Sequence, residues 1–188
     1  MSWPAPATLR GDHVTLAPLS HDHAPELAKA AASLGQLWYT AIPMPDGMAV
    51  EIERRLALPD MQPFTVLDAS NTPIGMTTYM NIDAINRRVE IGSTWVAPSA
   101  QRTPLNTEAK LLLLTHAFET LGCIAVEFRT HRLNQQSRRA IERLGAQLDG
   151  ILRAHSIMPN GTIRDTAAYS ITAAEWPTVK VHLQSRLL

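Results

Sequence analysis

A run of small polar side chains, Gln101-Arg102-Thr103-Pro104-Leu105-Asn106-Thr107, separates a segment with strand character from a long apolar segment with helical spacing. The first turn of a helix has backbone N–H groups without partners, and the helix dipole adds positive potential there. A helix that begins behind hydroxyl and amide side chains is therefore suited to bind phosphate. The pattern predicts a nucleotide-like cofactor. An ordinary turn with Asn106 or Thr107 as N-cap is the competing interpretation.

A carboxylate lies on the strand that precedes this loop. Glu90 shares a strand face with Gly92 and Thr94, opposite Val89, Ile91 and Trp95, because side chains alternate along a strand. Beside small residues, the carboxylate could accept a proton from an amine through a water molecule. A solvated charge, or an ion pair with Arg87 or Arg88, would explain the same residue without a catalytic role.

Two further polar residues open a later helix. Asn134 is a good N-cap, and Ser137 follows one turn later on the same side of the helix. Arg138 and Arg139 lie near the same helix start, where a cation opposes the helix dipole unless an anion is nearby. A solvated basic face is the alternative for these two arginines.

Composition restricts the class of protein. The 188 residues are 45% apolar and 18% charged, with 17 basic and 17 acidic side chains. Because there is no excess of positive charge, nucleic-acid binding is not expected. No apolar run approaches the roughly 20 residues of a membrane span, and the first residues lack a secretion signal. We expect one domain, residues 1–188, in the cytoplasm and without a membrane partner.

The cysteine and histidine content gives no sign of a disulfide or a metal. Cys123 is the single cysteine, so no internal disulfide can form. His13, His21 and His23 lie close together in sequence but lack a carboxylate–histidine ligand pattern. We expect no metal site.

Periodicity and turn residues place these side chains on a mixed fold. Strands are predicted at 8–18, 62–68, 73–82, 87–96, 123–131, 147–157 and 162–172, and helices at 21–34, 46–58, 106–121, 135–144 and 175–188. Ser20 and Asp46 are the expected caps of the first two helices, and Asn160-Gly161 is a strong hairpin signal. The order predicts an α/β (α+β) protein with a mixed, mostly antiparallel sheet of about seven strands and helices on both faces.

This order, with these residues, resembles the GNAT acetyltransferase superfamily, and within it the ribosomal-protein alanine and serine N-acetyltransferases. The resemblance extends from Leu9-Arg10-Gly11 to Glu175-Trp176. It is carried by Glu90-Ile91-Gly92, by the loop from Gln101 to Ala109, and by Asn134-x-x-Ser137, Leu144-Gly145 and Gly150-x-x-Arg153. It implies a central sheet that splays between the fourth and fifth strands, with acetyl-CoA bound as co-substrate in the opening.

The loop departs from the family pattern at two positions. Pro104 and Asn106 replace small residues, and Pro104 has no N–H to offer a diphosphate. Ile141 also stands where superfamily members often carry a tyrosine acid. The side chains of Arg102, Thr103, Asn106 and Thr107 could replace the lost donor.

The resemblance implies a set of site residues. Glu90 would be the general base and Ser137 would hydrogen-bond the departing thiolate. The backbone of Trp95 and Val96 would pair with the pantetheine arm and polarise the thioester. The cofactor would be bound by Trp95, Val96, Gln101, Arg102, Thr103, Leu105, Asn106, Thr107, Asn134 and Arg138, and the acceptor by Trp38, Tyr39, Glu90 and Arg153.

Two classes of function remain open at this stage, and the first divides by its acceptor. The first is acetyl transfer from acetyl-CoA to a primary amine by direct attack in a ternary complex, with either a protein N-terminus or a small molecule as acceptor. A GNAT-fold module that binds CoA or a protein without transferase activity is the alternative, because the loop is altered. The resemblance also implies a homodimer, to which the apolar segments of 147–172 could contribute.

Overall fold

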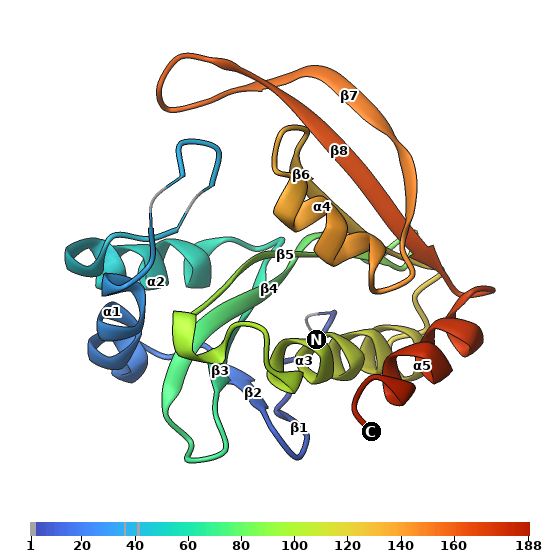
Figure 1. Ribbon diagram of the computed structural model, residues 1–188, viewed down its shortest axis with the longest axis horizontal. Coiled ribbons are helices and arrows are strands. Elements are labelled where there is room, and N and C mark those ends of the chain that lie inside the picture. Colours follow the sequence, from blue (N-terminus) through green and yellow to red (C-terminus); the bar gives the residue numbers. More distant parts are fainter. Residues whose placement is uncertain (1–2, 36, 41) are drawn as a thin grey trace.

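The computed structural model describes residues 3–35, 37–40 and 42–188. In these residues eight strands form one sheet in the order β1-β2-β3-β4-β5-β6-β8-β7 (Figure 1). The strands are β1 (Leu9–Arg10), β2 (Thr15–Pro18), β3 (Gln62–Leu67), β4 (Pro73–Asp83), β5 (Arg88–Val96), β6 (Ala125–His131), β7 (Gln147–Ile157) and β8 (Ile163–Thr172). The α-helices are α1 (Ala24–Ala32), α2 (Met48–Ala57), α3 (Pro104–Thr115), α4 (Gln135–Glu142) and α5 (Trp176–Ser185).

The sheet is mixed and mostly antiparallel, as predicted. Only β5 and β6 pair in parallel. The strand expected at 8–18 is instead two short strands, which raises the number of strands to eight. The chain turns between them, where Gly11 N donates to Val14 O at 2.9 Å. A Cβ atom at Gly11 would come within 2.4 Å of Glu108 Cδ on α3, so a larger residue there would have to displace this carboxylate.

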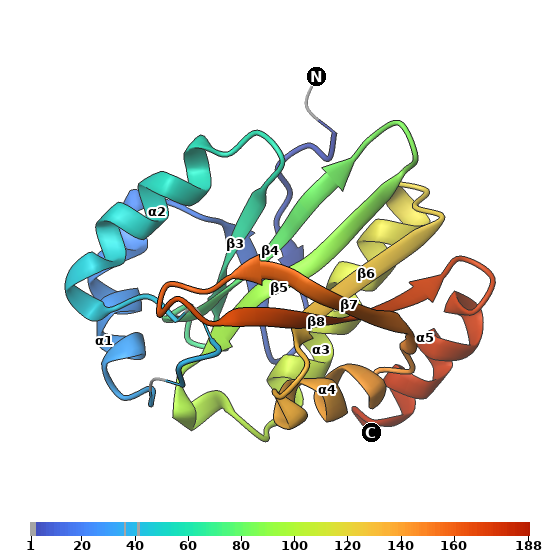
Figure 2. The ribbon, with the colours of Figure 1, turned by 90° about the horizontal axis from the view of Figure 1, so that it is seen from above.

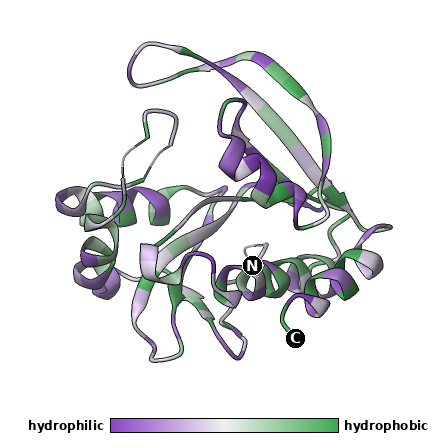
Figure 3. Cartoon of the chain, viewed as in Figure 1, coloured by the Kyte–Doolittle hydropathy of each residue, from purple (hydrophilic) through white to green (hydrophobic). Residues whose placement is uncertain are grey.

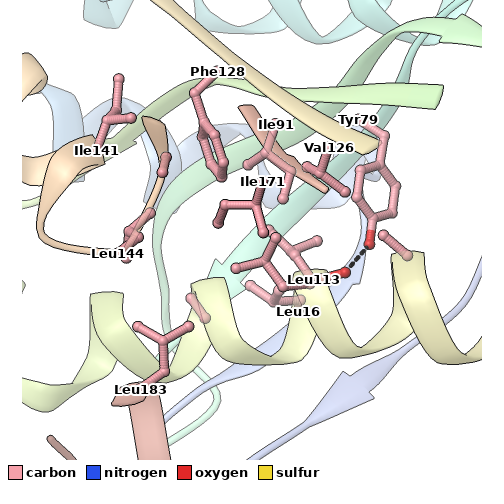
Figure 4. Packing of buried hydrophobic residues seen from close by; sticks show 14 of the residues in the cluster. Leu16, Tyr79, Ile91, Leu113, Val126, Phe128, Ile141, Leu144, Ile171 and Leu183 are labelled. Atoms are coloured by element: carbon pink, nitrogen blue, oxygen red, sulfur yellow. Dashed lines mark hydrogen bonds between the residues drawn. The ribbon is translucent and has the colours of Figure 1, made fainter. Parts of the chain in front are cut away.

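Helices cover both faces of the sheet, as predicted (Figure 2). On one face α3, α4 and α5 enclose the larger apolar core, in which Leu113, Ile141 and Leu183 meet the inward side of the strands (Figure 4). The Tyr79 hydroxyl, buried there, donates to Leu113 O at 2.6 Å. On the other face α1 and α2 cover a second cluster that contains Leu27, Ile52, Met76 and Trp95.

Three helix starts differ from the prediction. The helix expected at 21–34 begins as the 3-10 turn His21–His23, which Ser20 caps by accepting from Asp22 N, and α1 follows from Ala24. The helix expected from Asp46 begins at Met48, because Pro45–Gly47 form a 3-10 turn and no side chain caps the helix. The helix expected from Asn106 begins two residues earlier, with Pro104 in its first turn and Thr103 as N-cap. Proline fits this position because the missing N–H has no intrahelical partner in any case. Asn106 and Thr107 therefore lie inside the first turn and are not caps.

A bulge in β5 changes which way its later side chains point. Ser93 and Thr94 together oppose Thr77 of β4, and Ser93 has a φ of 48°. Because the extra residue reverses the alternation, Trp95 turns to the α1–α2 face, on the same side as Glu90. This corrects the expectation that Trp95 lies with Val89 and Ile91. Thr94 turns to the opposite side and meets α3.

A buried arginine supports this bulge from behind. Arg55 of α2 is 1% exposed and lies 2.7 Å from Glu51 on the same helix. Its Nη1 donates to Thr78 Oγ1 at 3.0 Å and to Ser93 O at 3.4 Å. One guanidinium therefore joins α2, β4 and the bulged residue of β5, and it satisfies a carbonyl that the regular ladder would have paired.

The β7–β8 hairpin extends beyond the end of β6. The Asn160-Gly161 turn that the sequence predicts is present, with Gly161 at a φ of 80° and Asn160 Oδ1 accepting from Thr162 N. In both ribbon views the tip of this hairpin approaches the loop that carries Trp38 and Tyr39 (Figures 1 and 2). Positions 36 and 41 of this loop lie outside the described residues.

The hydropathy of the helices differs with their place in the fold. Figure 3 shows α4 as mostly hydrophilic, whereas α3 carries hydrophobic residues along its length. Among the described residues, none of the helices is both long enough and apolar enough to cross a membrane.

Candidate active site

The cavity of interest opens where β5 and β6 part. These strands pair only over Arg88–Glu90 and Ala125–Glu127, and beyond that point no pairing joins them. A cavity of about 580 Å³ lies there, lined by β5 from Glu90 to Val96 and by β6 from Phe128 to His131. Its other walls come from the N-terminal half of α3, from α4 along its length, from the loop after α1, and from Met80 of β4 and Arg164 of β8. The strand divergence implied by the family resemblance is therefore present.

Glu90 is a buried carboxylate on the wall of this cavity. It is 4% exposed, and its Oε2 accepts from Asn81 Nδ2 at 2.7 Å. Arg129 Nε is 3.5 Å from the same oxygen, an ion-pair contact without hydrogen-bond geometry. Burial raises the pKa of Glu90, although Asn81 and Arg129 act in the opposite direction. A carboxylate with a raised pKa is a stronger base than an exposed one, which suits it to accept a proton near neutral pH.

Gly92 keeps space beside this carboxylate. A Cβ atom at this position would lie 2.6 Å from Met80 Sδ and 3.0 Å from Glu90 Oε1. A larger residue would therefore displace Met80 or push the carboxylate out of its position.

Backbone groups of β5 face the opening beyond the bulge. Ala97 N donates to Ile74 O on β4 at 2.7 Å. Because successive residues of a strand point their backbone groups to opposite sides, the Val96 N–H and C=O point away from β4 and toward the opening. Gln101 Nε2 donates to Val96 O at 3.2 Å, which leaves the Val96 N–H as the donor on this edge.

A second cavity of about 560 Å³ continues from this end of the first. It is lined by the start of α3 and by cations from three segments. Its walls include Gln101, Arg102, Thr103, Pro104, Asn106, Thr107, Gln136, Arg143 and Arg186. Thr103 caps no amide with its side chain, and its hydroxyl donates to Ala100 O at 2.8 Å. The backbone N–H groups of the first turn of α3 thus remain without a side-chain cap.

Lys110, on α3, is a buried amine on the floor of the main cavity. Its Nζ donates to Thr94 Oγ1 at 2.8 Å and to Thr77 Oγ1 at 3.3 Å, and within the described residues it makes no ion pair. Burial without a carboxylate lowers the pKa of Lys110 to about 7. The sequence analysis missed this residue. Its signal was a lone lysine at helical spacing between Thr107 and Leu114, on the inward face of an apolar helix.

The start of α4 reaches the cavity through two of its predicted residues. Asn134 caps the helix by accepting from Ser137 N at 3.0 Å, and both Asn134 and Ser137 line the cavity. Arg138 does not, because it turns to the sheet, where its Nε donates to the Tyr169 hydroxyl at 2.8 Å. Arg138 is therefore not placed to meet a cofactor in either cavity.

The far end of the main cavity carries an aromatic cluster. Trp38 and Tyr39 pack edge-on with ring centroids 5.3 Å apart, and the Trp38 centroid is 5.2 Å from that of His131. Tyr39 and His131 line the cavity, and Trp38 supports them. His131 Nδ1 accepts from Leu133 N at 3.1 Å, which places the proton of the neutral ring on Nε2. That Nε2 is buried and has no hydrogen-bond partner in the described part of the chain.

Two other predicted site residues also lie outside the cavities. Leu105 is 7% exposed and packs into the larger core, because the first turn of α3 directs it to the sheet. Arg153 has a side chain 82% exposed and lies 3.2 Å from Asp165 on the adjacent strand. The register of the hairpin shifts between Leu152 and Ser156, which turns this part of β7 to solvent. Arg164, which the prediction did not include, is the arginine of this hairpin that lines the cavity.

Comparison with known proteins gives consistent results. The family described as "Acetyltransferase (GNAT) domain" matches residues 13–147. A curated relative, "Putative ribosomal N-acetyltransferase YdaF" of Bacillus subtilis, is 34% identical over 102 residues, which cover 54% of this chain and 55% of that protein. The chain thus matches about half the length of this curated relative.

Solved structures share the fold over nearly the whole chain. A GCN5-related N-acetyltransferase from Brucella melitensis has a TM-score of 0.89 and 33% identity, covering 98% of this chain and 87% of that one. RimJ of Mycobacterium smegmatis, solved in complex with CoA-disulfide, has a TM-score of 0.75 and 21% identity, with coverage of 98% and 96%. At this lower identity the RimJ likeness concerns the fold alone.

Proposed function

Because the chain belongs to the GNAT acetyltransferase family, we propose that it transfers an acetyl group from acetyl-CoA to a primary amine. The observation that carries this proposal is the buried Glu90 carboxylate, with its raised pKa, on the wall of the cavity between β5 and β6. The family supplies the reaction class, and the geometry supplies the base.

The donor groups of the two cavities suit an acyl-CoA molecule. Cationic side chains and uncapped N–H groups at the start of α3 match a diphosphate and a nucleotide phosphate. The Val96 N–H is aligned to pair with an extended amide arm in the opening, as an added strand would. Acetyl-CoA, when bound, supplies the acetyl group as a thioester. RimJ, which shares the fold, was solved with a CoA-derived ligand.

The acceptor amine approaches from the end of the cavity that holds Glu90. Its nitrogen attacks the acyl carbon directly, so that a C–N bond forms as the C–S bond breaks. Glu90 accepts the ammonium proton through water, and Asn81 keeps the carboxylate in place. The Val96 N–H stabilises the charge on the carbonyl oxygen, and one such donor contributes about 3 to 4 kcal/mol in other enzymes. Ser137 lies where its hydroxyl can donate to the departing sulfur.

Release of free thiol from acetyl-CoA tests the proposal. Wild-type protein should release thiol only when an amine is present, over a panel of peptide N-termini, amino acids and polyamines. Glu90→Gln should lower kcat/KM for the acceptor by about 100-fold or more and remove the rise in rate with pH that a titrating base produces. An unchanged pH profile in Glu90→Gln would contradict the assignment of the base.

Titration calorimetry with acetyl-CoA separates this function from the alternative. Binding of acetyl-CoA without thiol release for any amine would favour a CoA-binding or protein-interaction module. The absence of binding would contradict both. The proposal takes residues 1–188 as one domain and includes a cytoplasmic homodimer, which sedimentation equilibrium of the full chain would test.

A further inference from the structure

The main cavity is lined by more cations than its proposed reaction requires. Among the described residues that line it, Glu90 is the single carboxylate, whereas three arginines and a lysine whose pKa is lowered to about 7 lie on its walls. These are Lys110, Arg129, Arg143 and Arg164. An amine acceptor is itself a cation before it loses its proton, so a positively charged site would repel it unless an anion compensates.

The cations divide between two ends of the cavity. Arg143 also lines the second cavity. Lys110 lies beside Thr94 and Thr107, two residues that line both cavities. These two cations belong to the end proposed for the anionic cofactor. Arg129 and Arg164 interact instead with Glu90. Glu90 precedes Val96 by six residues on β5, so about 20 Å would separate the two residues in a regular strand. The cofactor phosphates therefore do not account for them.

Arg129 is paired with carboxylates of the protein itself. Its Nη2 lies 2.8 Å from Glu127 Oε2, and its Nε lies 3.5 Å from Glu90 Oε2. Glu127 is also paired with Arg88. Arg129 thus completes a group of carboxylates and guanidinium ions and holds Glu90 in position.

Arg164 attracts Glu90 through its charge, but among the described residues it makes no ion-pair contact. It is half-buried, and its Nε donates to Thr166 Oγ1 at 2.9 Å, which fixes the direction of the side chain. In the described part of the chain its two Nη groups make no hydrogen bond and no ion pair. A guanidinium held by one bond, with its remaining donors in a cavity, has the geometry of a receptor for a carboxylate or phosphate. His131, on the same wall, adds a buried Nε2–H without a partner.

We propose that the acceptor is a small amine that carries its own oxyanion group, a carboxylate or a phosphate, which Arg164 binds while the amine faces Glu90. This inference rests on the proposed function, whose acceptor class it specifies. The anion offsets the repulsion between the guanidinium and the ammonium group, and it orients the nitrogen toward the base. A peptide N-terminus, which offers an amide carbonyl in place of the anion, would leave the Nη groups of Arg164 without an anionic acceptor.

The experiment compares acceptors that differ only in the anion. β-Alanine is paired with β-alanine amide, and phosphoethanolamine with ethanolamine, with a neutral tripeptide as the peptide reference. The variants are Arg164→Gln, Arg164→Lys and, as a control, Arg10→Gln, because Arg10 is exposed on β1 away from the cavity. The two anionic acceptors distinguish a carboxylate from a phosphate ligand.

We expect wild-type kcat/KM to favour one anionic acceptor over its neutral partner by about 10- to 100-fold, the usual contribution of a charge-assisted hydrogen bond. Arg164→Gln should bring the ratio of kcat/KM between the anionic and the neutral acceptor close to one, through a higher KM for the anionic acceptor. Arg164→Lys should keep part of this ratio, and Arg10→Gln should keep all of it. Equal rates for anionic and neutral acceptors, a preference for the tripeptide, or a uniform loss in Arg164→Gln would overturn the proposal.

A binding measurement keeps the two proposals apart. Each acceptor is titrated into the protein saturated with CoA, without turnover. Binding of the anionic acceptor that is lost in Arg164→Gln would support the anion site even if no thiol release occurs, in which case the transferase proposal alone fails. If the anionic and neutral acceptors bind alike, or neither binds, the anion site is refuted even in an active enzyme.

Discussion

The buried amine of Lys110 should make the stability of the apo protein depend on pH in a particular direction. In the unfolded chain this lysine keeps its proton up to about its ordinary pKa of 10.5, whereas burial lowers that pKa to about 7 in the fold. Between these two values the unfolded state binds more protons than the folded state, so the free energy of unfolding rises with pH. The charged form is the one that burial disfavours, and deprotonation removes that cost.

The expected magnitude follows from these two pKa values. At about 1.4 kcal/mol per pH unit, the penalty on the folded state at pH 7 has an upper limit of about 4 kcal/mol, and it declines by about 1.5 kcal/mol up to pH 8.5. Lys110→Met should remove it, because methionine fills a similar volume without a charge. Thr77 and Thr94 would remain hydrogen-bonded to each other at 2.8 Å. The variant should therefore be more stable than wild type at pH 7, by about 1 to 4 kcal/mol.

Urea unfolding at pH 7.0, 7.5, 8.0 and 8.5 measures this effect as the difference between variant and wild type. The advantage of Lys110→Met should shrink as pH rises. Cys123, whose pKa is raised to about 11 by burial, acts in the opposite direction but is present in both proteins and cancels in the difference. The control Lys29→Met changes an exposed lysine paired with Glu26 and should give a constant difference. Parallel stability curves for Lys110→Met and wild type would refute the argument.

Two further substitutions test the supports of the site. Arg55→Met should lower the free energy of unfolding by about 1 to 3 kcal/mol in a urea titration, because it leaves Thr78 Oγ1 and Ser93 O without this donor, although Glu51 keeps its pair with Arg54. Arg54→Met, on the exposed side of α2, should cost less than about 1 kcal/mol in the same titration. Pro104→Ala adds an N–H to the first turn of α3 and should tighten acetyl-CoA binding by about 1 kcal/mol in calorimetry; an unchanged affinity would indicate that this amide does not face the diphosphate.

Much of the fold was predictable because local signals agree with it. The period of apolar residues identified the meander strands and α3, and Asn160-Gly161 placed the last hairpin correctly. The capping role of Asn134 was also predicted and is confirmed. The turn that divides β1 from β2 was not, because its cause is tertiary: Gly11 is fitted against the Glu108 carboxylate of a helix almost a hundred residues away.

The candidate site was less predictable for the same reason. Gly92, directly before the bulge at Ser93, is a possible signal of it, but the prediction treated 87–96 as a regular strand. The bulge reverses the direction of Trp95 and brings Thr94 to Lys110. On the β7–β8 hairpin, strand position favoured Arg153 as an acceptor ligand. A register shift turns it outward, and Arg164, which only the assembled sheet brings beside Glu90, lines the cavity in its place.

The contact between Gly11 and Glu108 couples the first hairpin of the chain to the helix that begins at the proposed cofactor site. Glu108 accepts from Asp12 N at 2.9 Å and from His13 N at 2.7 Å, and it stands in the same helical turn as Asn106 and Thr107. A methyl group at position 11 would have to displace that carboxylate. Because Glu108 belongs to α3, we expect this displacement to shift the helix and with it the backbone amides of its first turn. Random mutagenesis screened for weakened acetyl-CoA affinity should therefore recover changes at position 11, remote though it is from any phosphate.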